Sequence, residues 1–438
     1  MSNITLGDFF TTDFVNYSSY DNLRKIPSVC DGLKNASRKI VSTLLDKHIT
    51  EPLKVSQLGA KVCEYRDYLH GSLDAVIVTL GQSYTGSNNL PLVQSKGNFG
   101  TRLSPEASAS RYIFASGSKE LFKLFSSDDD AILLKQTFEG YPIEPRYYLP
   151  ALPILLINGA EGISSGFACK ILPRNPKAIS DYLGMILLGN SGENTVDPFT
   201  PWFKGFKGSI VEIEPNQWLI SGVCEVISKN KVEITELPIG YSLRSYLAVL
   251  DKLEETKAIL GYDDNSDGDN FNFIVRFNSK DLANLGKPDL IKLLKLTKTV
   301  TENFTVLDEN NKIKVFNSAR ELFMHFFALK YQSLLKRKEH IIGIKELELS
   351  KLNNKARFIA AVLSNTIDIR STIAKLNKEL ERSGYASFNG YDYLLKMPMQ
   401  ALTKDRVSEL KQMIKDKQAE LDSYRASSIF TIWFQDLS

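Results

Sequence analysis

The sequence has little of what marks a secreted, zinc-binding or membrane-spanning protein. It contains four cysteines in 438 residues, none in a CxxC pair, and its four histidines do not lie near them at zinc-binding spacing. This pattern disfavours a structural zinc site and a disulfide framework, and it predicts reduced, mostly buried thiols. The most apolar run, LPALPILLING, is too short and too interrupted by proline to span a bilayer, and the N-terminus has no leader-like apolar region. We therefore expect a cytoplasmic protein without a membrane partner.

An excess of charge of one sign is also missing. The chain has 54 basic and 51 acidic residues, which gives a net charge of +3. A polyanion such as nucleic acid would therefore have to be bound by a local basic patch rather than by the field of the whole protein. The apolar content of 43% is ordinary for a globular protein, and the length allows two to four domains.

Familiar ligand-binding motifs are absent or incomplete. No segment fits the phosphate-binding pattern GxxxxGK[ST]. The segment 263–270, DDNSDGDN, matches the first half of a calcium-binding loop, but Ile274 stands where the loop needs a bidentate glutamate. We interpret it as an acidic surface turn rather than a calcium site. The glycine-rich segment 159–166 has no helix-opening lysine, so a tight turn is favoured over a phosphate cradle.

The composition changes along the chain and predicts an α+β multidomain protein. Residues 200–315 contain short runs of β-branched and aromatic residues between turns, whereas no proline falls between Pro288 and Pro398. The predicted divisions are an N-terminal arm (1–25), a mixed domain of short helices and loops (26–180), an α+β domain, called the tower below (181–315), a coiled coil (316–355 and 402–426), a helical knob (356–401) and a C-terminal return segment (427–438).

The C-terminal third predicts two long helices. Ser318 and Glu321 form a capping-box pattern at the start of a helix that could run over 318–353. A second helix, over 403–424, carries apolar residues at near-heptad spacing. An antiparallel coiled-coil arm that ends in a small helical knob is the simplest interpretation, with an ordinary helical bundle as the alternative.

One segment, GNFGTRLSPEASASRYIF (97–114), carries a pattern suited to chemistry. A tyrosine attacks phosphorus poorly while its phenol is protonated, with a pKa of about 10. A neighbouring cation or a metal-activated phosphate makes it useful. Arg111 directly precedes Tyr112 and could grip phosphate oxygens, and small residues before the pair leave room for a nucleic-acid backbone. From these residues alone, a phosphoryl-transfer centre and an ordinary packed tyrosine both stay open.

Several segments together resemble the DNA breakage-reunion subunit of type IIA DNA topoisomerases, the gyrase A class. The matching segments, which occur in the family's order over about residues 20–437, are RKIPSVCDGLKNASRK, YLHGS, KGNFGTRLSPEASASRYIF, LPILLINGAEGISSGFACKILPRNP, WFKGFKGSI, ITELP and LLKMPMQALTKDRVSELK. Tyr68 and Leu69 depart from the family pattern, which has His-Pro before the histidine that His70 matches. The resemblance implies a winged-helix-type DNA-gate domain, the tower, the coiled-coil arm and a helical exit-gate knob.

The resemblance also implies roles for individual residues. Tyr112 would be the nucleophile that forms a bond to the 5′ end of a cut strand, and Arg111 would contact the scissile phosphate. Ile171 would be the apolar wedge that enters between base pairs and bends the duplex. The other residues implied to contact DNA are Arg24, Lys34, Arg38, Lys39 and His70.

The family further implies partners and cofactors. Double-stranded DNA would be cut by a homodimer that closes through the DNA gate and the coiled-coil exit gate. ATP and Mg²⁺ would be held by a gyrase B-like ATPase/TOPRIM subunit, with no metal ligand in this chain. Because no DNA-wrapping propeller follows the arm, we expect relaxation rather than negative supercoiling.

The short architecture most resembles the T-even-type bacteriophage form of the family, the medium subunit. That form predicts a location in the bacterial cytoplasm or nucleoid, possibly of an infected host. A non-catalytic DNA-binding or chromosome-organising protein and a purely structural coiled-coil scaffold are the rival interpretations.

Overall fold

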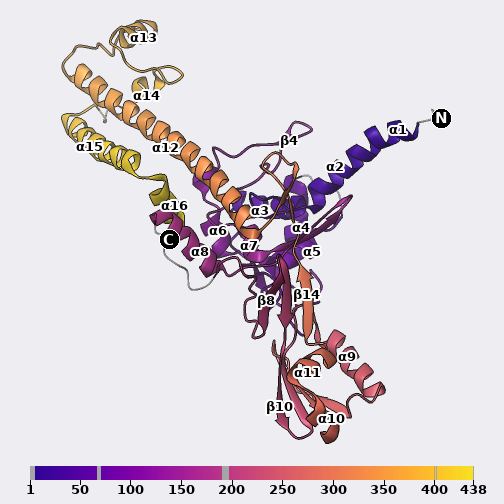
Figure 1. Ribbon diagram of the computed structural model, residues 1–438. Helices are drawn as coiled ribbons and strands as arrows, with labels where there is room; N and C mark the ends of the chain where they lie inside the picture. Colours follow the sequence, from indigo (N-terminus) through magenta and orange to yellow (C-terminus); the bar gives the residue numbers. More distant parts are fainter. Residues whose placement is uncertain (1–4, 67–70, 190–196, 399, 401, 438) are drawn as a thin grey trace. The chain divides into compact units, whose positions relative to one another are not determined.

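The computed structural model describes residues 5–66, 71–189, 197–398, 400 and 402–437 (Figure 1). The chain divides into two compact units: the first takes in Met1–Lys330 and Asp436–Ser438, and the second takes in Tyr331–Gln435. The architecture is α+β with several antiparallel sheets, as predicted. In the described part of the chain, no helix has both the length and the apolar character needed to cross a membrane.

The first unit begins with helices around a small antiparallel sheet. A short stretch, α1 (Leu6–Asp8) and a π-helical turn (Phe9–Asp13), leads into α2 (Phe14–Lys25). The sheet has the order β1-β3-β2, and its neighbouring helices bury the apolar side chains Ile40, Val41 and Leu58. The bounds are α3 (Asn35–Asp46), β1 (Leu53–Lys54), α4 (Val55–Arg66), α5 (Asp74–Gly81), β2 (Val93–Lys96) and β3 (Phe114–Gly117).

Short elements connect this sheet to the hairpin β6–β7 (Ala160–Ser164 and Phe167–Ile171) and the longer helix α8 (Pro176–Leu188). The connecting elements are α6 (Lys119–Leu124), a 3-10 turn (Ser127–Asp129), β4 (Thr137–Phe138), β5 (Tyr141–Pro142) and α7 (Ile154–Asn158). The bounds of α8 follow from its sequence. The Asn175 side chain accepts the first free backbone N–H groups, Pro176 occupies the first turn, and left-handed Gly189 ends the helix.

The tower contains two larger sheets, with strand orders β10-β11-β13-β12 and β14-β9-β8, and the hairpin β15-β16. Its elements are β8 (Ser209–Glu214), β9 (Gln217–Ser221), β10 (Val223–Ser228), β11 (Lys231–Glu236), α9 (Leu243–Glu255), β12 (Gly261–Asp264), β13 (Phe273–Arg276), α10 (Ser279–Asn284), α11 (Lys287–Leu293), β14 (Thr297–Thr301), β15 (Phe304–Leu307) and β16 (Ile313–Phe316).

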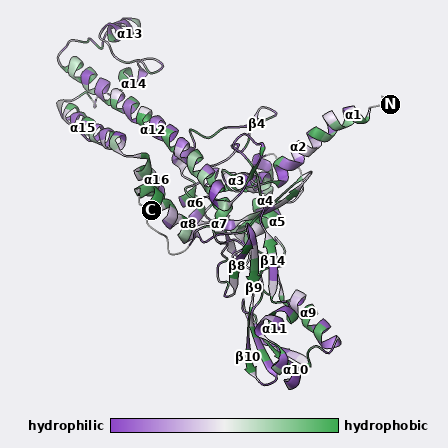
Figure 2. Cartoon of the chain, in the orientation of Figure 1, coloured by the Kyte–Doolittle hydropathy of each residue, from purple (hydrophilic) through white to green (hydrophobic). Residues whose placement is uncertain are grey.

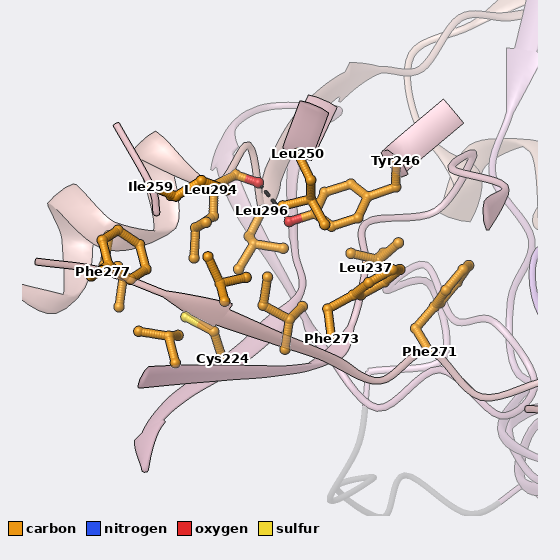
Figure 3. Packing of buried hydrophobic residues seen from close by; sticks show 14 of the residues in the cluster. Cys224, Leu237, Tyr246, Leu250, Ile259, Phe271, Phe273, Phe277, Leu294 and Leu296 are labelled. Atoms are coloured by element: carbon orange, nitrogen blue, oxygen red, sulfur yellow. Dashed lines mark hydrogen bonds between the residues drawn. The ribbon is translucent and has the colours of Figure 1, made fainter. Parts of the chain in front are cut away.

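Apolar side chains from the four-stranded sheet and the tower helices form one core (Figure 3). Within it, the Tyr246 hydroxyl donates to the backbone oxygen of Leu294 at 2.9 Å, so the buried phenol has a partner. The segment 263–270 forms part of β12 and the turn before β13, and Asp263 pairs with Arg276 at 2.7 Å. This arrangement matches the predicted acidic turn.

The second unit is helical. The helix α12 (Ala319–Leu363) begins in the first unit and continues into the second, which also contains α13 (Ile373–Arg382), α14 (Asp392–Leu395), α15 (Lys404–Ala426) and most of α16 (Ile429–Leu437). Hydrophobic and hydrophilic residues alternate along α12 (Figure 2). Ile359 of α12 packs with Leu410 of α15, and an ion pair joins Lys345 to Glu420 on the same two helices.

The helix α12 ends at Leu363, beyond the predicted end at residue 353. The added residues include ARFIAAVL, which holds no proline or glycine, and the helix ends shortly before Asn365, whose φ of +55° is left-handed. At the start, Ser318 accepts the Glu321 backbone N–H at 3.2 Å, but the Glu321 carboxylate accepts from the backbone of Asn317 rather than from Ser318. One half of the predicted capping box is therefore present, whereas in the other half the Glu321 carboxylate binds the residue before the N-cap.

Candidate active site

Tyr112 lies on the surface at the end of the loop that precedes β3. Its side chain is 66% exposed, whereas the next residue, Ile113, is buried. The backbone N–H of Tyr112 donates to the Ala109 oxygen at 2.9 Å, and the Ile113 oxygen accepts the Val55 N–H at 3.0 Å. The turn and the buried isoleucine together fix the backbone while leaving the phenol open to solvent. The tyrosine is therefore not an ordinary core residue.

Arg111 is exposed beside Tyr112. Its guanidinium carbon lies 4.8 Å from the centre of the Tyr112 ring, which is a cation–π contact. A guanidinium in this position can bind phosphate oxygens through two donors and offset the negative charge that develops during attack on phosphorus. The two predicted residues are thus both exposed and in contact with each other.

Glycines and a glutamine side chain set the shape of the loop. Gly100 has a φ of +92°, and a Cβ atom there would lie 2.4 Å from the Pro105 oxygen, so a larger residue would not fit. The Gln82 side chain donates to the oxygens of Phe99 and Pro105 at 2.9 and 3.2 Å. The loop before the tyrosine is therefore held by specific contacts with the residue that follows α5.

The predicted basic residues fall into two groups, of which the first is accessible. Lys34 is half-buried at the N-cap position of α3, and burial lowers its pKa. Arg24 is half-buried on α2, with its guanidinium 5.5 Å from the ring centre of Tyr20. Both side chains retain surface that a phosphate can reach.

The second group, Arg38 and Lys39, lies inside the protein. Arg38 is 8% exposed and binds both carboxylate oxygens of Asp31, at 2.7 and 3.0 Å. Lys39 binds Glu144 at 2.9 Å and the backbone oxygen of Arg66 at 2.7 Å. The structure therefore assigns these two predicted DNA contacts to internal ion pairs, because each cation already has a buried carboxylate partner.

The predicted wedge, Ile171, is also buried. It ends β7 opposite Ala160 at the base of the hairpin and is 3% exposed. Ile163, on β6 near the hairpin turn, is 73% exposed and is the isoleucine of this hairpin that can reach a ligand. Because no β-hairpin was predicted here, the sequence could not show that Ile163 lies near the hairpin turn and Ile171 at its base.

His70 lies outside the described residues.

Residues that the sequence interpretation missed include Lys170 and Lys298, which line a surface cavity of about 440 Å³. A second cavity, of about 360 Å³, shares Asn158–Glu161 with the first and includes Lys34 in its lining. Three cations thus border adjoining hollows together with Glu161, which lines both cavities and pairs with Lys170 at 3.5 Å.

Comparison with known proteins gives matches over nearly the whole chain. The family model for the A subunit of DNA gyrase/topoisomerase IV matches residues 24–438. The chain belongs to this family. Its curated relatives include a mitochondrial DNA topoisomerase 2 of Dictyostelium discoideum, 33% identical over 99% of this chain and 35% of the relative. DNA topoisomerase 2-alpha of Homo sapiens is 32% identical over 99% of this chain and 31% of the relative.

A solved structure of a eukaryotic relative is also similar. It is the DNA-binding, cleavage and re-ligation domain of Plasmodium falciparum topoisomerase II, with a TM-score of 0.85 and 31% identity over 98% of this chain and 63% of that chain. The chain spans about a third of the length of the curated relatives it matches. These relatives are eukaryotic, so the predicted bacteriophage kinship and bacterial location are not supported, and neither is a separate gyrase B-like partner.

Proposed function

We propose that this chain is the DNA breakage-reunion part of a type IIA topoisomerase and that Tyr112 is its nucleophile. The observation that carries the proposal is the exposed Tyr112 phenol beneath the Arg111 guanidinium, on a loop fixed by glycines and buried neighbours. Family membership and the likeness to a cleavage and re-ligation domain support it.

The proposed step is a transesterification. The Tyr112 oxygen attacks the scissile phosphorus, the bond from phosphorus to the 3′ oxygen breaks, and the phenol proton is lost while the 3′ oxygen gains one. The product is a 5′-phosphotyrosyl bond and a free 3′ hydroxyl. Because one phosphoester replaces another, the reverse reaction rejoins the strand without an external energy source. Arg111 would neutralise charge on the phosphate oxygens in both directions.

DNA would be bound through the accessible cations and an apolar contact. Arg24 and Lys34 would contact backbone phosphates, and His70 remains a proposed contact from the resemblance. Ile163 replaces Ile171 as the proposed wedge because an exposed apolar side chain at a hairpin tip can enter between base pairs. A homodimer would cut both strands with its two Tyr112 residues, let a second duplex pass, and thereby relax the DNA.

The family implies Mg²⁺ and ATP. Among the residues that the structure describes, no group of three or more His, Cys, Asp or Glu side chains is arranged to hold a metal ion. These residues do not fit a metal site, so we assign no step to a metal bound by this chain. We propose that the ATPase and metal-binding parts lie elsewhere in the complete enzyme, whether on the same chain or another.

The test is covalent capture of cut DNA. The complete enzyme that contains this chain is mixed with Mg²⁺ and supercoiled plasmid, stopped with detergent and digested with protease. We expect linear DNA with protein on its 5′ ends from the wild type and none from Tyr112→Phe. Tyr141→Phe is the matched control, because Tyr141 is also exposed but lies on β5; it should cleave normally.

A non-catalytic DNA-binding protein on the same fold is the alternative. It predicts that Tyr112→Phe changes nothing, because binding would be the whole function. Failure of the wild type to cleave or relax plasmid in the complete enzyme would favour this alternative and contradict the proposal. DNA affinity should be unchanged in Tyr112→Phe under either hypothesis, so cleavage is the deciding measurement.

A further inference from the structure

The tyrosine loop carries a second arginine, Arg102, that the proposed chemistry does not use. It is 6% exposed and lies ten residues before Tyr112. Its guanidinium reaches the tower, where Nη2 lies 2.5 Å from a carboxylate oxygen of Glu236 and 2.9 Å from the backbone oxygen of Leu237. Glu236 is the last residue of β11 and Leu237 follows it, so the loop is attached to the tower through a buried cation.

Glu236 is suited to this attachment. It is 1% exposed, and its two carboxylate oxygens accept the backbone N–H groups of Leu237 and Lys207, each at 2.9 Å. Those two hydrogen bonds hold the carboxylate in place independently of the arginine. Glu236 also follows Val232 and Ile234 at alternate positions of β11, so it stands on the buried face of the strand.

Neighbouring contacts extend the attachment along the loop. The Arg102 backbone N–H donates to an Asp269 carboxylate oxygen at 3.2 Å, and the Leu103 oxygen accepts the Leu243 N–H at 3.0 Å. The Leu103 side chain packs against the tower core. The loop is thus bound to the tower at residues 102–103, and to the helices and small sheet through Gln82 and Ile113.

A buried ion pair rarely adds much net stability, because the cost of removing both charges from water offsets their attraction. What such a pair does provide is fixed geometry, since each group has its hydrogen-bonding capacity used in one arrangement. For in-line attack on phosphorus, misplacement of the nucleophile by about 1 Å costs on the order of 100-fold in rate.

We propose that Arg102 and Glu236 are positioning residues that fix the tyrosine loop to the tower and thereby set the rate of DNA cleavage by Tyr112. This inference rests on the proposed function. It predicts that weakening the pair slows cleavage while leaving DNA affinity nearly unchanged, because neither residue is exposed to bind DNA itself.

The experiment uses the complete enzyme that contains this chain and a short labelled duplex. Single-turnover cleavage rate and Kd for the duplex are measured for the wild type, Glu236→Gln, Arg102→Met and Arg102→Lys. We expect a roughly 10- to 100-fold lower rate for Glu236→Gln and Arg102→Met, with Kd within about twofold of wild type. Arg102→Lys, which keeps the positive charge, should recover part of the rate lost in Arg102→Met.

The control separates positioning from general loss of tower stability. Tyr246→Phe removes a buried hydrogen bond to Leu294 in the same tower core (Figure 3), but it removes no contact that the loop makes with Glu236. Thermal unfolding of all variants shows how far each is destabilised. If Tyr246→Phe is destabilised as much as Glu236→Gln but cleaves at the wild-type rate, the positioning role is supported.

Three results would overturn the inference. Wild-type cleavage rates in both Glu236→Gln and Arg102→Met would show that the pair does not position the loop. A rate loss matched by Tyr246→Phe would assign the effect to tower stability. A rate loss that disappears at saturating DNA would assign it to binding. If the wild type itself fails to cleave, the proposed function falls and this inference with it.

Discussion

At the residue scale, Lys34 and Arg38 show how two basic residues close in the sequence come to lie in different surroundings. Residues four apart share a face only when both are inside a helix. Lys34 is extended, with a ψ of 165°, and forms the N-cap of α3, whereas Arg38 lies within the helix. Arg38 therefore turns to Asp31, which is fully buried and also accepts the backbone N–H groups of Leu33 and Tyr148. Asp31 lies seven residues before Arg38 and outside the helix, so helical periodicity could not predict this pairing.

Substitution by glutamine should affect protein stability at Arg38 and DNA binding at Lys34. We expect Arg38→Gln to lower the free energy of unfolding by about 3–5 kcal/mol, because it leaves the Asp31 carboxylate buried without its cation. We expect Lys34→Gln to leave the free energy of unfolding nearly unchanged. The association constant for duplex DNA should fall less steeply with salt, because the slope of its logarithm against log salt loses about 1 in magnitude. Denaturant unfolding and binding at several salt concentrations measure these effects. Equal stability of the two variants would contradict the assignment.

At the element scale, the hairpin β6–β7 illustrates what the sequence could and could not predict. The glycine-rich segment indicated a tight turn, whereas the structure places strand β6 and the turn to β7 there, with Ile163 exposed beside the turn. It did not indicate that α2 supports the hairpin: Asp21 accepts the Ser165 N–H at 2.9 Å, and a Cβ atom at Gly162 would lie 2.3 Å from the Lys25 oxygen. Such contacts join residues that are far apart in the sequence, and periodicity carries no information about them. The predicted N-terminal arm therefore packs on the hairpin at its C-terminal end.

The two isoleucines of the hairpin should separate DNA distortion from folding. Ile163→Ala should leave unfolding unchanged, since the side chain is mostly exposed, but should reduce duplex bending, measured by energy transfer between dyes on the two DNA ends. Ile171→Ala should cost about 2–5 kcal/mol of stability, because it removes a buried side chain. A loss of bending in folded Ile171→Ala, with normal bending in Ile163→Ala, would return the wedge to Ile171.

At the scale of the whole molecule, the order and type of the regions could be predicted better than their limits. The long charged segments without proline indicated the helices α12 and α15, and the short runs of β-branched residues indicated the strands of the tower. The division at Tyr331 falls inside α12, because a helix can continue from one packed body into another without a change in composition. The Arg102–Glu236 contact was equally hidden, since only the fold brings a loop and a distant strand end into contact.

The two units should also lose stability separately. Leu380 is fully buried in a cluster of the second unit that includes Phe358 and Leu394. We expect Leu380→Ala to destabilise this unit by about 2–5 kcal/mol through the cavity it leaves. Hydrogen exchange should then rise in residues 331–435, whereas Tyr112 and its loop, which belong to the first unit, should keep their protection and their DNA cleavage.

The control for this prediction is Ile373→Ala. Ile373 lies on the same helix, α13, but is 71% exposed, so its substitution should change neither hydrogen exchange nor cleavage. An equal rise of exchange in the described residues of the first unit in Leu380→Ala would mean that the two units unfold together. The loop that presents Tyr112 would then depend on the helical unit for its stability, and cleavage by Leu380→Ala should fall in step with its unfolding.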